Sequence, residues 1–171
     1  MSGRSAGLPL ASTTYYFSSL DDLIAKAVEH VGIRETQQLR ERVDMLSRRR
    51  RGAESTADVL VDLLVGDGPG SRVSEQLISR YERYITCARQ PALRDIQRRV
   101  LRQRTDAVGE AVERSGRCVR TDLLSALVCA VDGAVVSALV DDGGSARDSA
   151  RATLVDVIDV LAPFDQHVAH V

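Results

Sequence analysis

The chain has 171 residues, and 44% of them are hydrophobic, which excludes a chain that is disordered throughout. Its 23 basic and 24 acidic residues nearly cancel. This excludes a globally basic nucleic-acid-binding protein and restricts any such contact to a local patch. We find no apolar run long enough to span a membrane and no signal-peptide core after Met1, so the sequence predicts a soluble cytoplasmic protein.

The residues that most often carry catalysis or bind metals form no recognisable constellation. Cys87, Cys118 and Cys129 contain no C-x-x-C pair, which favours reduced, mostly buried thiols over metal ligands. His30 stands alone on a predicted helix, and there is no nucleophile elbow, so an enzyme is the least favoured class. His167 and His170 lie in a tail that we expect to be frayed, and without a third ligand nearby they predict no metal site. No cofactor is expected.

The first informative stretch spans residues 6–24. It predicts a tight turn, a very short helix over 9–14, a second turn and the start of a long helix. Pro9 suits a first helical position, because its missing N–H is no loss there. Ser18 and Ser19 offer oxygen atoms to the free N–H groups of the next helix. A short polar helix of this kind is better suited to contact a partner than to form a core.

This stretch resembles the second half of the helix-turn-helix of tetracycline-repressor (TetR) family regulators. The residues at the matching spacing are Ala6, Gly7, Leu8, Tyr15, Tyr16, Phe17 and Leu23. Residues 88–94 resemble, more weakly, a segment of one subgroup of the family's C-terminal domains. There are two departures from the pattern. Leu20 replaces the usual phosphate-contacting Lys, and only residues 1–5 precede the stretch, so we expect the first helix and nearly all of the second to be missing.

The resemblance implies a homodimer that reads a near-palindromic operator in double-stranded DNA. The short helix would enter the major groove. The residues implied for base and phosphate contacts are Leu10, Ala11, Ser12, Thr14, Tyr15 and Tyr16. Leu8 and Phe17 would pack beneath them.

Helical periodicity predicts a long helix from Leu20 to about residue 50, with a soft spot at Gly32. The four arginines of 48–51 end it. They are interpreted as cations favoured at a helix C-terminus, and the alternative is a phosphate clamp. Ser55 is predicted to cap a short helix that reaches about residue 65. The glycine-rich run 66–70 has no Gly-Lys-Ser/Thr, so it predicts a loop and not a nucleotide cradle.

Two helices are predicted over 73–88 and 92–114, the second restarted by Pro91. The expected inward face of the first comprises Val73, Leu77, Ile78, Tyr81, Ile85 and Ala88. One face of the second carries Arg94, Arg98, Arg99, Arg102 and Arg104. This face is interpreted as solvated. The alternative, a second nucleic-acid surface, is less favoured because no aromatic residues are interleaved for base stacking.

The last two predicted helices span 121–141 and 146–161, and the first of them is apolar on more than one face. Small residues near Gly133 would let another backbone approach closely. This pattern predicts a two-fold four-helix bundle between two chains, and the alternative is packing inside one monomer. The residues assigned to the dimer interface are Leu124, Leu127, Val131, Val135, Leu154 and Ile158.

The predicted fold is all-α and TetR-like, a partial helix-turn-helix followed by a helical ligand-binding and dimerisation bundle. The expected division is a DNA-binding remnant over 1–30, a regulatory body over 31–165 and a tail over 166–171. A small-molecule effector is expected between helices of the body. Tyr81, Tyr84 and Cys87 are candidate lining residues, with core packing as the alternative. The leading hypothesis is a ligand-responsive repressor. The alternatives are a truncated ligand-sensing and dimerisation module that does not bind DNA on its own, and a structural bundle without a ligand.

Overall fold

The structure is a computed structural model that describes residues 18–66, 70–141 and 144–165. The residues predicted to contact DNA lie outside these ranges: Leu10, Ala11, Ser12, Thr14, Tyr15 and Tyr16. The described part is helical and contains no strand. Its elements are α2 Leu20–Asp44, α3 Ala53–Leu64, α4 Gly70–Arg89, α5 Pro91–Arg114, α6 Thr121–Ala138 and α7 Ala146–Leu161. The predicted all-α fold is confirmed.

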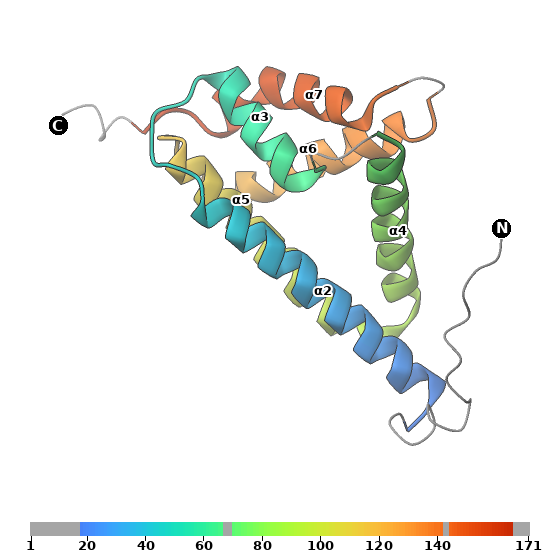
Figure 1. The fold of residues 1–171 in the computed structure, drawn as a ribbon. Helices are drawn as coiled ribbons and strands as arrows, with labels where there is room; N and C mark the ends of the chain where they lie inside the picture. The colour runs from blue at the N-terminus through green and yellow to red at the C-terminus, as the bar shows by residue number, and fades with distance from the viewer. Residues whose placement is uncertain (1–17, 67–69, 142–143, 166–171) are drawn as a thin grey trace.

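The helices form a roughly triangular arrangement (Figure 1). α2 and α5 run side by side along one edge, α4 forms a second edge, and α3, α6 and α7 gather along the third. Gly32 of α2 marks a close approach to α5, because a Cβ atom there would lie 2.5 Å from Cγ2 of Val100. The glycine that looked like a soft spot in the sequence is therefore a point of tight helix packing.

The main hydrophobic core lies where α3, α6 and α7 meet the C-terminal half of α5. Its most deeply buried residues include Leu60, Leu64, Val108, Val112, Leu127, Val131, Val135, Leu154 and Ile158. These residues recur at intervals of three or four along each helix, which is the spacing that places them on one face. The burial of this set stabilises the end of the molecule that lies farthest from the start of α2.

The long helix is shorter than the sequence predicted. α2 begins as expected, with the hydroxyl of Ser19 accepting the Asp22 N–H at 3.1 Å, but it ends at Asp44. The arginine run follows as an irregular connection whose N–H groups at Arg49 and Arg51 each donate to carbonyls at the end of α5, at 3.0 Å. The interpretation of this run as the cationic end of a helix is therefore wrong.

The N-terminus of α3 also differs from the prediction. The helix begins at Ala53, with Gly52 in the capping position and no side-chain cap. Ser55 lies inside the first turn, and the neighbouring Thr56 is fully buried, with its hydroxyl donating to the Gly52 carbonyl at 2.9 Å. The Ser55 capping prediction fails because Gly52, in extended conformation, takes the capping position three residues earlier.

The inward face of α4 is rotated relative to the prediction. Val73 and Leu77 are buried as expected, but Ile78, Ile85 and Ala88 are exposed, and Cys87 is buried instead. The prediction of mostly buried thiols is also wrong, because Cys118 and Cys129 are exposed. Residues on α4 therefore face α5 along a stripe that includes Tyr84 and Cys87.

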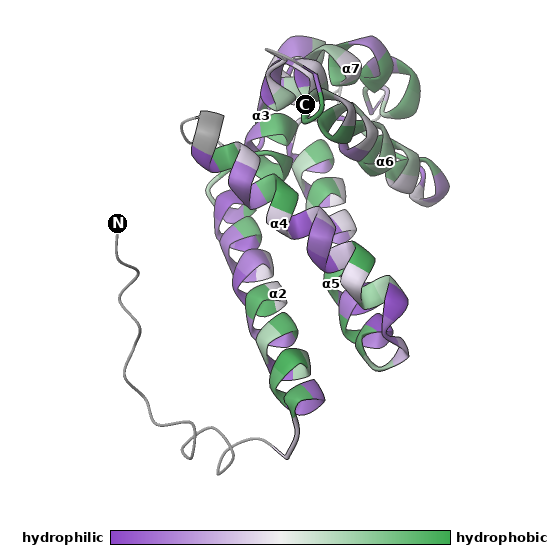
Figure 2. Cartoon of the chain, turned by 90° about the vertical axis from the view of Figure 1, so that its right-hand side faces the viewer, coloured by the Kyte–Doolittle hydropathy of each residue, from purple (hydrophilic) through white to green (hydrophobic). Residues whose placement is uncertain are grey.

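One described helix, α6, is long and apolar enough to cross a membrane by length and composition, contrary to the expectation that no such run exists. Figure 2 shows hydrophobic residues following one another along it. A single such helix is weak evidence for a membrane span, because core helices meet the same test. About a third of α6 is buried within the chain, and its exposed residues are mostly small ones.

Candidate ligand-binding site

A partly buried polar cluster joins α4, α5 and α6. The guanidinium of Arg104 donates from Nη1 and Nη2 to the two carboxylate oxygens of Asp132, both at 2.8 Å. The hydroxyl of Tyr81 donates to Oδ1 of the same carboxylate at 3.0 Å. A buried charge is tolerated when it is paired and hydrogen-bonded. Arg104 is therefore part of this cluster, and its place on the predicted solvated face of α5 is corrected.

The electrostatics of the cluster fix its protonation states at neutral pH. Burial raises the pKa of Tyr81, and the negative charge of Asp132 raises it further, so the phenol stays protonated. Burial alone would lower the pKa of Arg104, but its hydrogen bonds to Asp132 more than reverse this effect. The cluster is thus a neutralised pair with a protonated tyrosine attached to it.

Tyr84 lies beside this cluster. Its ring meets that of Tyr81 edge-on, with centroids 5.8 Å apart and an interplanar angle of 86°. A cavity of about 460 Å³, broadly open to solvent, lies beyond it between α4 and α5. It is lined by Tyr84, Cys87, Ala88, Arg94, Gln97, Arg98 and Leu101. This volume falls in the range of small-molecule sites, roughly 300–1,000 Å³.

Gln97 is the unusual member of this lining. Gln97 belongs to the buried stripe of α5 and is only 6% exposed. Neither Oε1 nor Nε2 of its side chain has a hydrogen-bond partner within the described part of the chain. A buried amide without partners loses its hydration and gains nothing in return. Of the cavity's lining residues, Gln97 has the greatest unmet capacity to bind a polar group.

The two arginines at the cavity are already engaged. Arg94 donates from Nε and Nη2 to the Ala88 carbonyl, at 3.1 and 2.9 Å. Arg98 donates to Asp95 at 2.7 Å. Burial raises the pKa of Cys87, so its thiol stays protonated. The cavity is consequently lined by an uncharged phenol, thiol and amide, with cations only where carbonyl or carboxylate oxygens already hold them.

The sequence assigned Tyr81, Tyr84 and Cys87 to the pocket, and the structure separates them. Tyr84 and Cys87 line the cavity, whereas Tyr81 lies behind Tyr84 in the polar cluster. Gln97 was missed, although the sequence contains a signal for it. Gln97 lies at the spacing of the buried stripe of α5, four residues after Leu93, and a polar residue at a core-facing position is a candidate for binding.

Tyr84 also borders a second, smaller cavity of about 50 Å³ that reaches α2 and α3. The residues lining it include Thr36, Leu39, Leu64 and Arg104. The same ring therefore separates the space between α4 and α5 from the interior next to α2.

The six residues assigned to the dimer interface belong to the core of a single chain. Leu124, Leu127, Val131, Val135, Leu154 and Ile158 are all buried there. None of the six is more than 9% exposed, so they have little surface to offer a second copy, and their assignment to an interface stays a prediction. The exposed outer face of α6 carries Cys129, Gly133 and Val136, and Val140 lies in the turn just after the helix ends.

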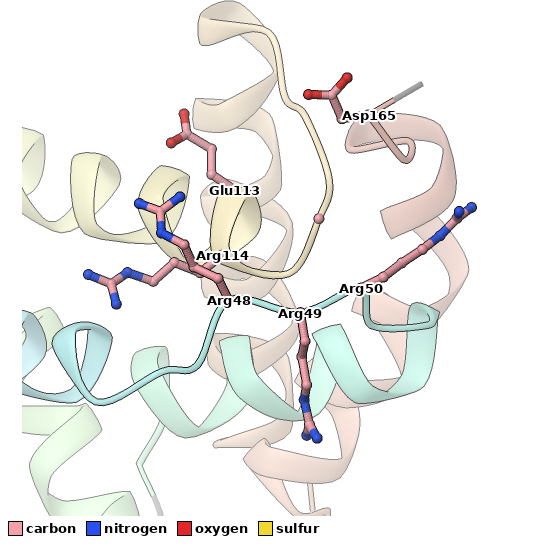
Figure 3. A pocket seen from close by; sticks show the side chains of 7 residues that line it. Arg48, Arg49, Arg50, Glu113, Arg114 and Asp165 are labelled. Atoms are coloured by element: carbon pink, nitrogen blue, oxygen red, sulfur yellow. The ribbon is translucent and has the colours of Figure 1, made fainter. Parts of the chain in front are cut away.

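A further pocket of about 270 Å³ lies at the arginine connection, next to Gly116 and Asp165. Figure 3 shows Arg49, Arg50 and Arg114 extending in different directions rather than toward one point. The guanidinium carbon of Arg50 lies 4.1 Å from the centroid of the Phe164 ring. Arg114 donates a hydrogen bond from Nη2 to Oε1 of Glu110 at 2.7 Å. This arrangement fixes the C-terminal segment to the connection and does not form a convergent anion site.

Comparison with known proteins places most of this helical body in a family. The family model described as "Tetracyclin repressor-like, C-terminal domain" matches residues 51–160, more than half of the chain and the whole of α3 to α6 with nearly all of α7. No curated protein and no solved structure matches the chain. Within the described residues, no group of three or more His, Cys, Asp or Glu side chains is placed to hold a metal ion.

Proposed function

The chain belongs to the tetracycline-repressor-like family, and on this premise we propose that it is a transcriptional regulator that binds operator DNA as a homodimer and releases it when a small molecule binds the helical body. The observation that carries this proposal is the family's regulatory domain over 51–160, joined by α2 to the stretch that resembles a recognition helix. Repression is the expected outcome of DNA binding.

The contacts of α2 support a route from the cavity to the DNA-binding end. α5, which carries Gln97, packs against α2 at the tight Gly32–Val100 contact. An ion pair between Arg99 and Glu29, at 3.2 Å, joins the same two helices nearer the start of α2. A ligand that separates α4 from α5 would therefore shift α2, provided that it binds one arrangement of the helices better than the other.

The outer face of α6 is proposed as the dimer interface. Val136 on that face is 46% exposed, and Val140, in the turn that follows α6, is 82% exposed. A Cβ atom added to the neighbouring Gly133 would meet no described atom within 4 Å apart from its chain neighbours and the backbone of its own helix, so the surface there is open. A face with small residues allows the close approach of a partner helix in a four-helix bundle. The occupant is a second copy of this chain.

The test of dimerisation is sedimentation equilibrium on the double variant Val136→Glu/Val140→Glu, which should be monomeric while the wild type is a dimer. Ile33→Glu on α2 is the matched control, because Ile33 is 49% exposed and lies on another helix. A double variant that remains dimeric would remove this face from the proposal.

The test of DNA binding is a gel shift with near-palindromic operator fragments. Tyr15→Ala should abolish the complex, and Ile33→Glu should leave it intact. Measurements at several salt concentrations would report the phosphate contacts. Binding that is unchanged in Tyr15→Ala would remove the opening stretch from the interface.

A second candidate function is a ligand-sensing and dimerising module that does not bind DNA by itself. It is favoured by Leu20, which is 70% exposed at the start of α2 where the family pattern has a phosphate-contacting Lys. Lys26 is the nearest cation along the described part of α2. The variant Leu20→Lys discriminates between the two. A regulator should gain affinity with a steeper salt dependence, whereas the module would stay unbound.

A further inference from the structure

We propose that the cavity between α4 and α5 takes an uncharged, largely apolar small molecule that presents a hydrogen-bond donor and acceptor side by side, as a lactam or carboxamide does, and that Gln97 is its recognition residue. This inference rests on the proposed function, in which the same cavity holds the effector. It adds the chemical class of that effector.

The side-chain amide of Gln97 is available to hydrogen-bond a ligand. Its amide has an acceptor, Oε1, and a donor, Nε2, and both are buried without partners within the described residues. A ligand with a C=O and an N–H on adjacent atoms satisfies both at once, in the paired geometry of two amides. A ligand with one of these groups leaves the other buried amide atom unsatisfied, which costs affinity.

The charges of the lining side chains favour a neutral ligand. Arg94 and Arg98 lie at the cavity and would repel a cationic ligand, but they already donate to the Ala88 carbonyl and to Asp95. An anionic ligand could bind the two arginines only by replacing these hydrogen bonds. Cys87 and Tyr84, whose pKa values burial raises, add no negative charge at neutral pH. A neutral ligand therefore fits the lining better than an ion of either sign.

The volume and the apolar lining of the cavity indicate the size and polarity of the ligand. The rest of the lining is apolar, with the Tyr84 ring, the methyl group of Ala88 and the side chain of Leu101. A volume of about 460 Å³ accommodates a bicyclic aromatic body. Such a body would cover the tyrosine ring while its polar edge reaches Gln97.

Isothermal titration calorimetry of the full chain with three bicyclic probes tests this. 2-Quinolone carries the donor–acceptor pair, its N-methyl derivative lacks the donor, and naphthalene lacks both groups. For the wild type, 2-quinolone should bind about tenfold more tightly than the N-methyl derivative, the equivalent of about one net hydrogen bond. Naphthalene should bind more weakly still.

Gln97→Leu should reduce the preference for 2-quinolone to within about twofold, while Gln103→Leu, an exposed glutamine of the same helix, should keep it. Gln97→Leu should also raise the melting temperature of the ligand-free protein, because it removes a buried amide that has no partners. The rise shows that the variant is folded.

Three outcomes would overturn the inference: no binding of 2-quinolone by the wild type, equal binding of 2-quinolone and its N-methyl derivative, or a preference that survives in Gln97→Leu. Equal binding is also the result expected if water alone satisfies Gln97. These measurements contain no DNA, so they are separate from the proposed function. If 2-quinolone binds as described but a gel shift shows no protein–DNA complex at all, the regulator proposal fails and the binding chemistry stands.

Discussion

Asp132→Ala should destabilise the chain strongly, because it leaves a buried cation without a counter-charge. The side chain of Arg104 is 9% exposed and that of Asp132 is 24% exposed. Breaking a fully buried pair by removing one partner costs about 3–5 kcal/mol. Water reaches part of the Asp132 side chain, so the lower end applies, and we expect a loss of about 3 kcal/mol. This is a large share of the roughly 5–15 kcal/mol that stabilises a typical domain.

Urea unfolding followed by circular dichroism, at one fixed protein concentration, measures this loss as a lower midpoint at unchanged slope. The double variant Asp132→Ala/Arg104→Met should recover most of the stability, because it no longer buries an unpaired charge. Asp106→Ala, which removes an exposed acid from α5, should change stability by less than about 0.5 kcal/mol. The reasoning is refuted if Asp132→Ala costs less than about 1 kcal/mol or if Arg104→Met restores nothing.

Three further predictions follow from the packing and the accessibility of single groups. Gly32→Ala should destabilise the chain by about 1–3 kcal/mol in urea unfolding, because the new methyl group overlaps Val100, and adding Val100→Ala should recover part of the loss. The raised pKa of Tyr81 means that its contribution to stability is complete below about pH 10 and is lost at higher pH. Tyr81→Phe should therefore flatten the alkaline fall in stability, and an unchanged fall would contradict this. Cys118 and Cys129 are exposed in one chain, so a thiol reagent should modify Cys118 rapidly at all protein concentrations but Cys129 only in dilute, monomeric protein. Equal rates at high concentration would place Cys129 outside the interface.

The orientation of α4 illustrates where sequence reasoning stops. Periodicity identified this helix, but it assigned Ile85 to the inward face, whereas the structure exposes it and buries Cys87. The stripe that faces inward depends on the direction from which α5 packs. That direction depends on the whole fold and cannot be inferred from the sequence of a single helix.

Gln97 shows the same division within the candidate site. Its position on a buried stripe can be recognised from the heptad-like spacing of α5, so a polar residue at a core position was open to prediction. Its missing hydrogen-bond partners were not, because they depend on which side chains of α4 stand opposite. The separation of Tyr81 from Tyr84 likewise follows from Asp132, which is 51 residues away from Tyr81 along the chain.

The sequence by itself determined that this protein is an all-α chain with helices near the observed bounds, because helical periodicity, prolines and glycine-rich turns are local signals. It also determined the resemblance to tetracycline repressors, since the spacing of an aromatic cluster is local as well. Only the tertiary structure decided which apolar residues are covered within the chain. The stripe of Leu127, Val131 and Val135, which is buried here, would suit a monomer core or a dimer interface equally well. The hydrophobic effect is non-directional, so any surface that excludes water from these side chains stabilises their burial.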